Sequence, residues 1–409
     1  MALQRHGCDV AVLCPNGHPL NTVSGIAQRY RYRGMSSLAS LRHAIALAKP
    51  DMLVPCDDGV VAQLHALHDL EPSMRPLIER SLGPPASYPV VRSRTQLLSL
   101  AKSLGVKIPR TERATNAEEL VDRHRQFSSK VVVKVDGESG GNGVRMCTSV
   151  DDAMDAWCAM SRPLKVTTAW KRLIIDRDPL TLWQQRQKRK PEVSIQEFIR
   201  GRPANCMMVC RRGHVLSVVS VMVVVAEGSV GASTVVRIVQ NPQMTRAAEL
   251  LAAHLQLSGF FGLDFMIDEA GVAHLIEMNP RCTQLGHFEL PDRGSLAGVF
   301  SADLRGEALR VDRPIQSSVI ALFPQALAGG PACSPYIAQS YHDVPTEESA
   351  LVDELSLPSW PHRQWTSKVY HRFFPFRPSE PLSFEKPGET AYADSSTTLE
   401  PRPDLATVR

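Results

Sequence analysis

The sequence predicts an α/β protein that begins with a small parallel sheet and continues with a larger region of strands and helices. Between residues 10 and 70, short apolar strands alternate with segments of helical apolar spacing, which is the order of a β-α-β-α unit. Between residues 193 and 239, successive strands are separated by short turns. Residues 262–281 then read as two strands joined by a Gly-containing turn.

The N-terminal region, residues 1–87, is expected to form one α/β domain. Its predicted elements are the end of a helix at residues 3–6, a strand at 10–14, a helix at 36–49, a strand at 51–55 and a helix at 57–70. An α/β domain normally has a strand before its first helix, so we expect this domain to lack that strand.

The central region, residues 88–310, holds most of the remaining predicted elements. A helix capped by Ser93 and ended by Gly105 comes first, and Thr115-Asn116-Ala117-Glu118 is a capping-box signature for the next helix. The other elements are strands at 130–135, 193–199, 204–211, 214–226 and 232–239, and a helix at 243–257. The basic stretch 161–191 interrupts them, and it reads as a solvated helix or loop or, alternatively, as an electropositive lid over a nucleotide.

The C-terminal region, residues 311–409, differs from the rest in composition. Proline becomes frequent, and from about residue 377 the chain is polar and poor in apolar residues, so we expect it to be disordered. Residues 352–376 contain Trp360, Trp365 and several Phe, and we expect them to pack back on the body of the protein.

Composition narrows the class of protein. A length of 409 residues allows two or three domains, and a net charge of +4 indicates neither a nucleic-acid partner nor a membrane partner. The nine cysteines are scattered without a Cys-x-x-Cys pair, which favours reduced thiols over a zinc site or disulfides. Residues 1–9 are polar and do not read as a signal peptide, so we expect a cytoplasmic protein.

The hairpin at residues 262–281 carries the clearest chemical signal. Side chains alternate between the two faces of a strand, so Glu277, Asn279 and Arg281 share one face. Asp264 lies on the partner strand, where the hairpin could bring it close to Glu277. Carboxylate and amide oxygens of this kind suit Mg²⁺, and the guanidinium beside them suits a phosphoryl group or a carboxylate.

Two alternatives to that interpretation stay open. A surface hairpin with polar residues on its wet face would look similar, although Pro280 stops the second strand abruptly just after the acid and the amide. The glycine-rich loop at residues 136–143, which follows Lys134, could either cradle a phosphate or serve only as a flexible turn.

Taken together, residues 10–309 resemble the ATP-grasp superfamily, the fold of carbamoyl-phosphate synthetase, biotin carboxylase and many carboxylate–amine ligases. The most specific match is Gly262-x-Asp264-Phe265 followed by Ile276-Glu277-Met278-Asn279-Pro280-Arg281. The resemblance implies an N-terminal domain, then a domain of two α+β subdomains that hold ATP between them. It also implies Mg²⁺, with Mn²⁺ as an alternative.

The resemblance also implies roles for individual residues. Asp264, Glu277 and Asn279 would hold the metal, and Asn279 and Arg281 would act on the transferring phosphoryl group. The residues implied in ATP binding are Arg94, Lys134, the flap glycines Gly140, Gly141 and Gly143, the adenine segment Glu197, Phe198 and Ile199, and Arg237 by a loose alignment. The ribose contact is unassigned, because Pro203-Ala204-Asn205 stands where many members have an acid.

The expected function is an ATP- and Mg²⁺-dependent ligase that activates a carboxylate as an acyl phosphate for attack by an amine or similar nucleophile. Its partners would be small-molecule carboxylates and amines, and a homo-oligomer stays open. His287 could face the acceptor, although a structural histidine is the plainer account. A nucleotide-binding sensor without turnover is the second hypothesis. A dinucleotide-dependent oxidoreductase fails for want of a Gly-x-Gly-x-x-Gly after a first strand.

Overall fold

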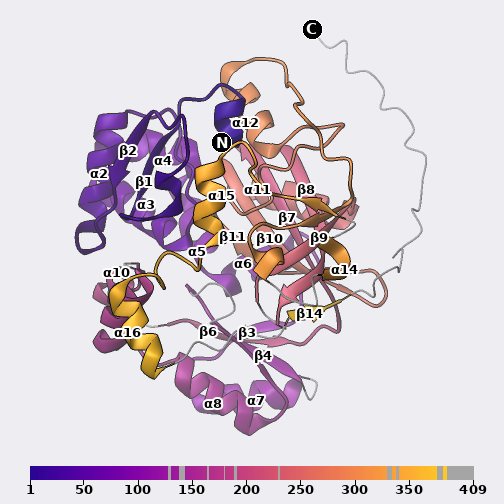
Figure 1. Cartoon of the computed structure of the whole chain (residues 1–409). Helices are drawn as coiled ribbons and strands as arrows, with labels where there is room; N and C mark the ends of the chain where they lie inside the picture. The colour runs from indigo at the N-terminus through magenta and orange to yellow at the C-terminus, as the bar shows by residue number, and fades with distance from the viewer. Residues whose placement is uncertain are drawn as a thin grey trace, which may run out of the picture.

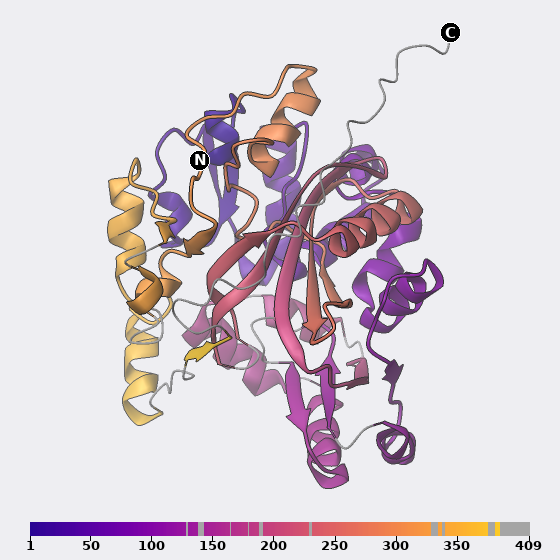
Figure 2. The same ribbon diagram turned by 90° about the vertical axis from the view of Figure 1, so that its right-hand side faces the viewer.

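The computed structural model describes most of the chain, namely residues 1–127, 130–137, 143–163, 165–178, 180–187, 191–228, 231–328, 334–337, 340–374 and 381–384. Three regions make up the described structure (Figures 1 and 2). They are an N-terminal layer of helices on a small sheet, a small four-stranded subdomain and a large, mainly antiparallel sheet. No helix among the described residues is long and apolar enough to cross a membrane.

The N-terminal region has a two-stranded parallel sheet covered by helices. Its elements are α1 (Ala2–Arg5), β1 (Ala11–Cys14), η1 (Pro19–Asn21), β2 (Gln28–Arg31), η2 (Gly34–Ser36), α2 (Ser37–Ala48), α3 (Asp58–Leu70), η3 (Pro72–Met74), α4 (Arg75–Leu82), η4 (Pro85–Ser87) and α5 (Tyr88–Arg92). The apolar faces of α2, α3 and α4 form one core. Asp57 caps α3 by accepting from the N–H groups of Gly59 and Val60.

The predicted strand at residues 51–55 is wrong. This segment is extended, but the N–H of Leu53 donates to the hydroxyl of Ser81 and the carbonyl of Pro55 accepts from Cys282, so no neighbouring strand completes a ladder. The second strand of the sheet is instead β2, whose sequence Gln-Arg-Tyr-Arg has no apolar alternation and is largely exposed. Strand pairing with β1 decided this element, and local pattern did not reveal it.

The small subdomain is a four-stranded sheet of order β3-β6-β4-β5 with helices on one face. Its elements are β3 (Thr111–Arg113), α7 (Ala117–Gln126), β4 (Val131–Val135), β5 (Val144–Cys147), α8 (Val150–Met160) and β6 (Val193–Glu197). The core lies between β4, β6 and helices α7 and α8. The predicted capping box is shifted by one residue, because Asn116 caps α7 and Glu119 accepts from both the N–H and the hydroxyl of Thr115.

The large sheet runs β11-β10-β7-β8-β9-β12-β13, and β14 pairs with β8. Its strands are β7 (Gly201–Arg211), β8 (His214–Glu227), β9 (Ser233–Val239), β10 (Gly259–Asp268), β11 (Ala273–Asn279), β12 (Val319–Ala321), β13 (Tyr341–His342) and β14 (Pro381–Ser383). Helices α6 (Arg94–Ser103) and α11 (Pro242–Leu255) pack on one face, and α12 (Leu296–Arg305) packs on the other. The sheet therefore has a buried core on both sides.

The described part of the C-terminal extension contains both strands and helices. It supplies β12, β13 and β14 to the large sheet, together with the helices α13 (Gln325–Ala328), α14 (Ser334–Ile337), α15 (Ser349–Ser356) and α16 (Trp365–Phe373). The expectation of disorder from about residue 377 is wrong for β14, which pairs with β8. Residues 375–380 and 385–409 lie outside the described residues.

The basic stretch 161–191 contains α9 (Val166–Lys171), the π-helical turn η5 (Arg172–Asp176) and α10 (Leu180–Arg186). Arg186 donates to the carbonyl of Met35 at 3.2 Å, so α10 contacts the N-terminal region. Helix α16 packs against η5 through a hydrogen bond of 3.0 Å from the Thr366 hydroxyl to the Ile174 carbonyl. The stretch is therefore a helical bridge between the small subdomain, the N-terminal region and the C-terminal extension.

Candidate active site

Two carboxylates face each other across the β10–β11 hairpin. Asp264 pairs in register with Glu277, and Gly262 pairs with Asn279 two residues along. The Asn279 amide donates to Asp264 Oδ2 at 3.0 Å. Asn205 on the adjacent strand β7, in register with Asp264, donates to Asp264 Oδ1 at 2.7 Å. The hairpin thus brings Asp264, Glu277 and Asn279 together, as the alternation of side chains predicted.

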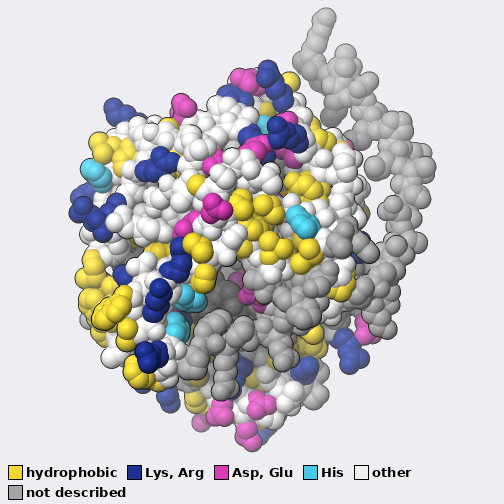
Figure 3. Space-filling view, in the orientation of Figure 1, with side chains coloured by type: hydrophobic (Ala, Val, Ile, Leu, Met, Phe, Trp, Pro, Cys, Tyr) yellow, Lys and Arg dark blue, Asp and Glu magenta, His cyan; other side chains and the backbone are white. Residues whose placement is uncertain are grey.

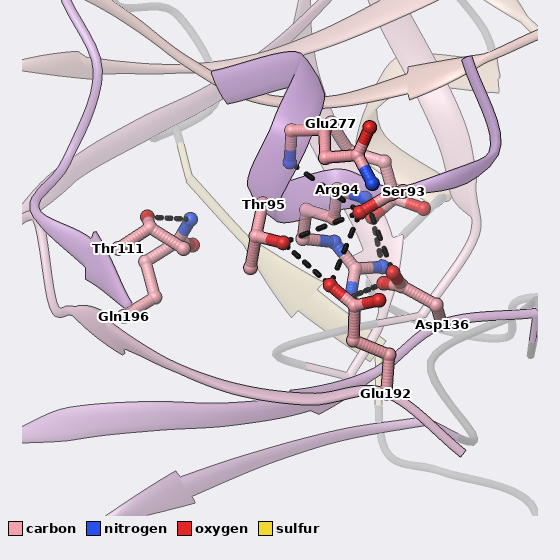
Figure 4. A network of polar contacts seen from close by, with 9 residues as sticks. Ser93, Arg94, Thr95, Thr111, Asp136, Glu192, Gln196 and Glu277 are labelled. Atoms are coloured by element: carbon pink, nitrogen blue, oxygen red, sulfur yellow. Dashed lines mark hydrogen bonds and ion pairs between the residues drawn. The ribbon is translucent and has the colours of Figure 1, made fainter. Parts of the chain in front are cut away.

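Arg94 joins this pair from the first turn of α6. Its side chain is buried, and its two terminal nitrogens reach Asp136 Oδ1 at 2.8 Å and Glu277 Oε2 at 3.1 Å (Figure 4). The backbone N–H of Arg94 also donates to Asp136 Oδ2 at 3.1 Å. A single guanidinium therefore links the large sheet to the loop after β4.

Lys134 is buried at the end of β4, beside the same acids. Burial and the nearby Arg94 lower its pKa to about 8, while Glu277 and Asp264 act in the opposite direction. Burial also raises the pKa of Asp264, and the negative charge of Glu277 raises it further. The positive charges of Arg94 and Lys134 repel each other, and so do the negative charges of Asp264 and Glu277. A divalent cation beside the acids, or a polyphosphate beside Arg94 and Lys134, would relieve this repulsion.

Sequence reasoning missed a second polar group at the start of α6. The hydroxyls of Ser93 and Thr95 both donate to Glu192 Oε1, and Ser93 also caps the helix at the N–H of Gln96 (Figure 4). Glu192 immediately precedes β6, so these bonds fix the small subdomain against α6. Only the Ser93 cap was visible in the sequence, because nothing local indicates a partner 99 residues away.

Arg281 faces the N-terminal region. Its Nε donates to Asp58 Oδ2 at 2.9 Å, and its Nη2 donates to Asn279 Oδ1 at 3.3 Å. The N–H of Cys282 donates to the carbonyl of Pro55 at 2.9 Å, so the end of the hairpin is joined to the segment before α3 by backbone as well. Asp58, which sequence reasoning did not select, thereby reaches the group of residues around Asp264.

The expected adenine segment lies at the end of β6, in the same sheet as Lys134. Glu197 pairs in register with Val131 of β4 and accepts from the N–H of Arg110 at 3.2 Å. The ammonium of Lys130 lies 4.2 Å from the ring centroid of Phe198. Ile199 follows in the loop and is half-buried. This segment therefore belongs to the small subdomain and lies outside the cluster around Asp264.

Arg237, the flap glycines and His287 are the expectations that remain. Across the large sheet, Asp264 is in register with Asn205, Asn205 with Val221, and Val221 with Ile238. Residues in register share one face of the sheet, so Arg237, the neighbour of Ile238, points to the opposite face from Asp264. Gly140 and Gly141 lie outside the described residues, whereas Gly143 accepts from the N–H of Val135 at 2.9 Å. His287 pairs with Asp343 at 2.7 Å, which favours the structural account of this histidine.

The donor set around Asp264 fits a hard cation. Among the described residues, no three His, Cys, Asp or Glu side chains form a metal-binding group. Two carboxylates and the amides of Asn205 and Asn279 meet here instead, and oxygen is the only donor type that these acids and amides offer to a cation. Mg²⁺ takes one or two carboxylates and completes its coordination with water and phosphate oxygens, so this set suits it.

Comparison with known proteins identifies the part of the chain that holds the acids of this cluster. Residues 179–284 match a family model described as an ATP-grasp domain. The chain contains an ATP-grasp domain. The match includes Asp264 and Glu277, whereas Arg94 and Lys134 precede it in the sequence. No curated protein sequence matches the chain.

Solved structures share the fold at low identity. The biotin carboxylase domain of the Hydrogenobacter thermophilus 2-oxoglutarate carboxylase, solved with MgADP, ADP and bicarbonate, is 12% identical with a TM-score of 0.52 and covers 76% of this chain and 67% of its own. The Staphylococcus aureus N5-carboxyaminoimidazole synthetase, solved with ADP, is 14% identical with a TM-score of 0.52, covering 76% and 74%. The Aspergillus clavatus N5-carboxyaminoimidazole synthase, solved with ADP and 5-aminoimidazole ribonucleotide, is 15% identical with a TM-score of 0.52, covering 78% and 74%. These likenesses show the ATP-grasp fold of the chain.

Proposed function

We propose that the protein is an ATP- and Mg²⁺-dependent ligase that activates a carboxylate as an acyl phosphate for attack by an amine or similar nucleophile. The observation that carries this proposal is the convergence of Asp264 and Glu277 with Arg94 and Lys134, brought from two subdomains to one place. Paired acids for a metal and paired cations for phosphate are the groups that phosphoryl transfer requires.

Each side chain has a role in this proposal. Asp264, Glu277 and Asn279 would hold Mg²⁺, which supplies charge neutralisation of the phosphates when bound. Lys134 and Arg94 would neutralise ATP oxygens from the other side. Arg281 would orient the transferring phosphoryl group, and it is held in place by Asp58 and Asn279. No protein nucleophile is needed, since the second substrate attacks the acyl phosphate.

The solved structures with a similar fold support carboxylates as the substrate class. Those solved with ADP include a biotin carboxylase domain that also holds bicarbonate, and an N5-carboxyaminoimidazole synthetase. We therefore propose small carboxylates, bicarbonate included, and amines as the first substrates to test. The adenine segment at Glu197, Phe198 and Ile199 and the flap at Gly140, Gly141 and Gly143 remain predicted ATP contacts, and a cytoplasmic location remains a prediction from the sequence.

A nucleotide-binding sensor without turnover is the second candidate. In the described structure, Arg94 already bonds Glu277, and Asn279 and Asn205 already bond Asp264, so the acids are satisfied by protein donors. A sensor could keep that arrangement permanently, whereas an enzyme must exchange some of these donors for metal and phosphate. Release of phosphate in the presence of substrates separates the two candidates.

The test is calorimetry of ATP binding with and without Mg²⁺, on the wild type and on Glu277→Gln. We expect binding to depend on Mg²⁺ and to weaken in the variant by about tenfold or more, because one of two acidic metal ligands becomes neutral. Glu249→Gln, a partly exposed position on α11, is the matched control and should bind normally.

The same proteins are then assayed for phosphate release with pooled carboxylates and amines. Release that Glu277→Gln abolishes while its circular dichroism stays unchanged would support a ligase. Normal activity of that variant would remove the metal assignment, and Mg²⁺-dependent binding without any release would favour the sensor.

A further inference from the structure

Helix α16 and the helical segment α9–η5, which are in contact, expose apolar faces instead of burying them. In α16, Trp365, Val369 and Phe373 are four residues apart and form one stripe along the helix, with Trp365 77% exposed and Phe373 72% exposed. The inward side of the same helix carries Ser367, which is fully buried. The usual orientation of an amphipathic helix is therefore reversed here.

A second stripe with the same spacing lies on α9 and η5. Val166, Trp170 and Ile174 are again four residues apart, and each is more than 40% exposed. The two stripes belong to packed elements, because Thr366 bonds the Ile174 carbonyl and the Lys171 ammonium lies 4.8 Å from the Tyr370 ring centroid. We call these six exposed side chains, on elements that are in contact, the Trp patch.

The charges around the Trp patch are mostly positive. Residues 165–176 and 364–374 contain Lys165, Lys171, Arg172, Lys368 and Arg372, and one acid, Asp176 at the end of η5. On the side of the molecule where Figure 1 places α16, yellow apolar side chains are interleaved with dark blue Lys and Arg and cyan His in Figure 3. Exposed apolar surface on this scale marks an interaction site, and its basic frame limits the choice of partner.

We propose that the Trp patch binds the surface of an anionic lipid membrane. Tryptophan and phenylalanine prefer the interface between headgroups and acyl chains, and Lys and Arg beside them are attracted to anionic headgroups. A second copy of the chain fits worse, because a two-fold contact through this patch would bring two basic surfaces together. The attachment is peripheral, in keeping with the absence of a spanning helix among the described residues.

This inference revises the expectation from overall charge that no membrane partner exists. The net charge of +4 averages over the whole chain, whereas the Trp patch concentrates Lys and Arg within two short segments. The proposal does not rest on the proposed ligase activity. It places whatever nucleotide chemistry the protein performs at a membrane surface.

The test is co-sedimentation of the full chain with vesicles of phosphatidylcholine alone or mixed with phosphatidylserine. Binding should require phosphatidylserine and should weaken between about 0.1 M and 1 M salt, because the screening length falls from about 10 Å to 3 Å. The double variants Trp365→Ser with Phe373→Ser and Lys368→Glu with Arg372→Glu should each bind about tenfold more weakly or worse.

A matched control removes exposed leucines elsewhere. Leu47 and Leu70, at the ends of α2 and α3, are 56% and 65% exposed, and Leu47→Ser with Leu70→Ser should leave vesicle binding unchanged. No binding to phosphatidylserine vesicles at low salt would overturn the proposal, as would normal binding by both patch variants. Self-association that the Trp365→Ser, Phe373→Ser variant abolishes, without vesicle binding, would instead make the patch a contact between copies.

Discussion

Lys134 is buried among charged groups that shift its pKa in opposite directions. Burial and Arg94 favour the neutral amine, whereas Glu277, Asp264 and Asp136 favour the ammonium, and the outcome is a pKa of about 8. A triphosphate beside Lys134 would add negative charge and restore a high pKa. The residue therefore links nucleotide binding to pH within an experimentally accessible range.

We predict that ATP affinity falls as the pH rises from about 7 to 9 and that binding near pH 8 takes up a proton. In the protein without ATP, the Lys134 amine is partly neutral at that pH, whereas in the complex it is charged. A proton must therefore be taken up when ATP binds. Lys134→Met should weaken ATP binding about 10- to 100-fold and abolish the proton uptake, measured by calorimetry in buffers of different ionisation enthalpy. The exposed Lys102→Met on α6 is the control, and an unchanged pH profile in Lys134→Met would count against the assignment.

Asp58 is the residue through which the N-terminal region reaches the site. We predict that Asp58→Ala weakens binding of a non-hydrolysable ATP analogue about tenfold while leaving ADP binding unchanged. Arg281 loses the carboxylate that holds its side chain, and under the proposed function Arg281 orients the transferring phosphoryl group. Asp303→Ala is the matched control, since Asp303 pairs with Arg211 at 2.6 Å. Equal losses for the analogue and for ADP would mean that Asp58 has only a structural role.

At the scale of single elements, helix α3 is anchored by a buried aromatic stack. His65 is almost completely buried and stacks on Tyr88 with ring centroids 3.7 Å apart. Burial, with smaller contributions from Arg92 and His68, lowers the pKa of His65 to about 3. The unfolded chain therefore binds a proton at this residue near its ordinary pKa of about 6.5, whereas the folded chain does not.

This difference predicts loss of stability in mild acid. Because the unfolded state binds more protons between about pH 6.5 and pH 3, the stabilisation present above that range is lost progressively as the pH falls. Thermal unfolding followed at pH 7 and pH 5 should show a smaller drop in Tm for His65→Phe than for the wild type. His43→Phe, at an exposed position on α2, should behave like the wild type, and equal drops in all three proteins would contradict the prediction.

The hairpin shows why some elements were predicted well. The alternation in β10 and β11 is local, so the face shared by Glu277 and Asn279 and the pairing with Asp264 followed from the pattern. β2 has no such pattern, and residues 51–55 contain a short apolar run but no partner strand. Local reasoning therefore missed the first strand and wrongly predicted the second. A strand depends on its neighbour, whereas a capped helix mostly does not.

At the scale of the whole molecule, the C-terminal extension packs on both the N-terminal region and the large sheet. Leu351 of α15 packs with Val23 and Ile26 of the N-terminal region, and β14 pairs with β8 of the large sheet. Segments more than 300 residues apart in the sequence are thereby joined, and Ser24 bonds Glu348 at the same contact. The N-terminal region therefore depends on the end of the chain for part of its core.

We predict that Leu351→Ala destabilises the protein by about 2–5 kcal/mol, because a buried leucine is replaced by a cavity. Urea unfolding measures this change. Leu357→Ala, at a half-exposed position just after α15, should cost much less. Equal stability of the two variants would show that α15 does not contribute to the folded core.

The sequence by itself determined the chemistry and the local geometry of this protein. Helix caps at Asp57 and Ser93, the alternating acids of the hairpin and the resemblance carried by Glu277 to Arg281 all depend on residues close together in the chain. Only the tertiary structure decided which distant groups meet. The pairing of Asn205 with Asp264 arises from strand pairing within the large sheet, and that of Arg94 with Glu277 arises because α6 packs on this sheet. The pairing of Asp58 with Arg281 arises because the N-terminal region packs against the end of the hairpin. The same is true of the Trp patch, since the sequence shows the Trp and Phe residues of this segment but only the packing of α16 against η5 decides which of them remain in water.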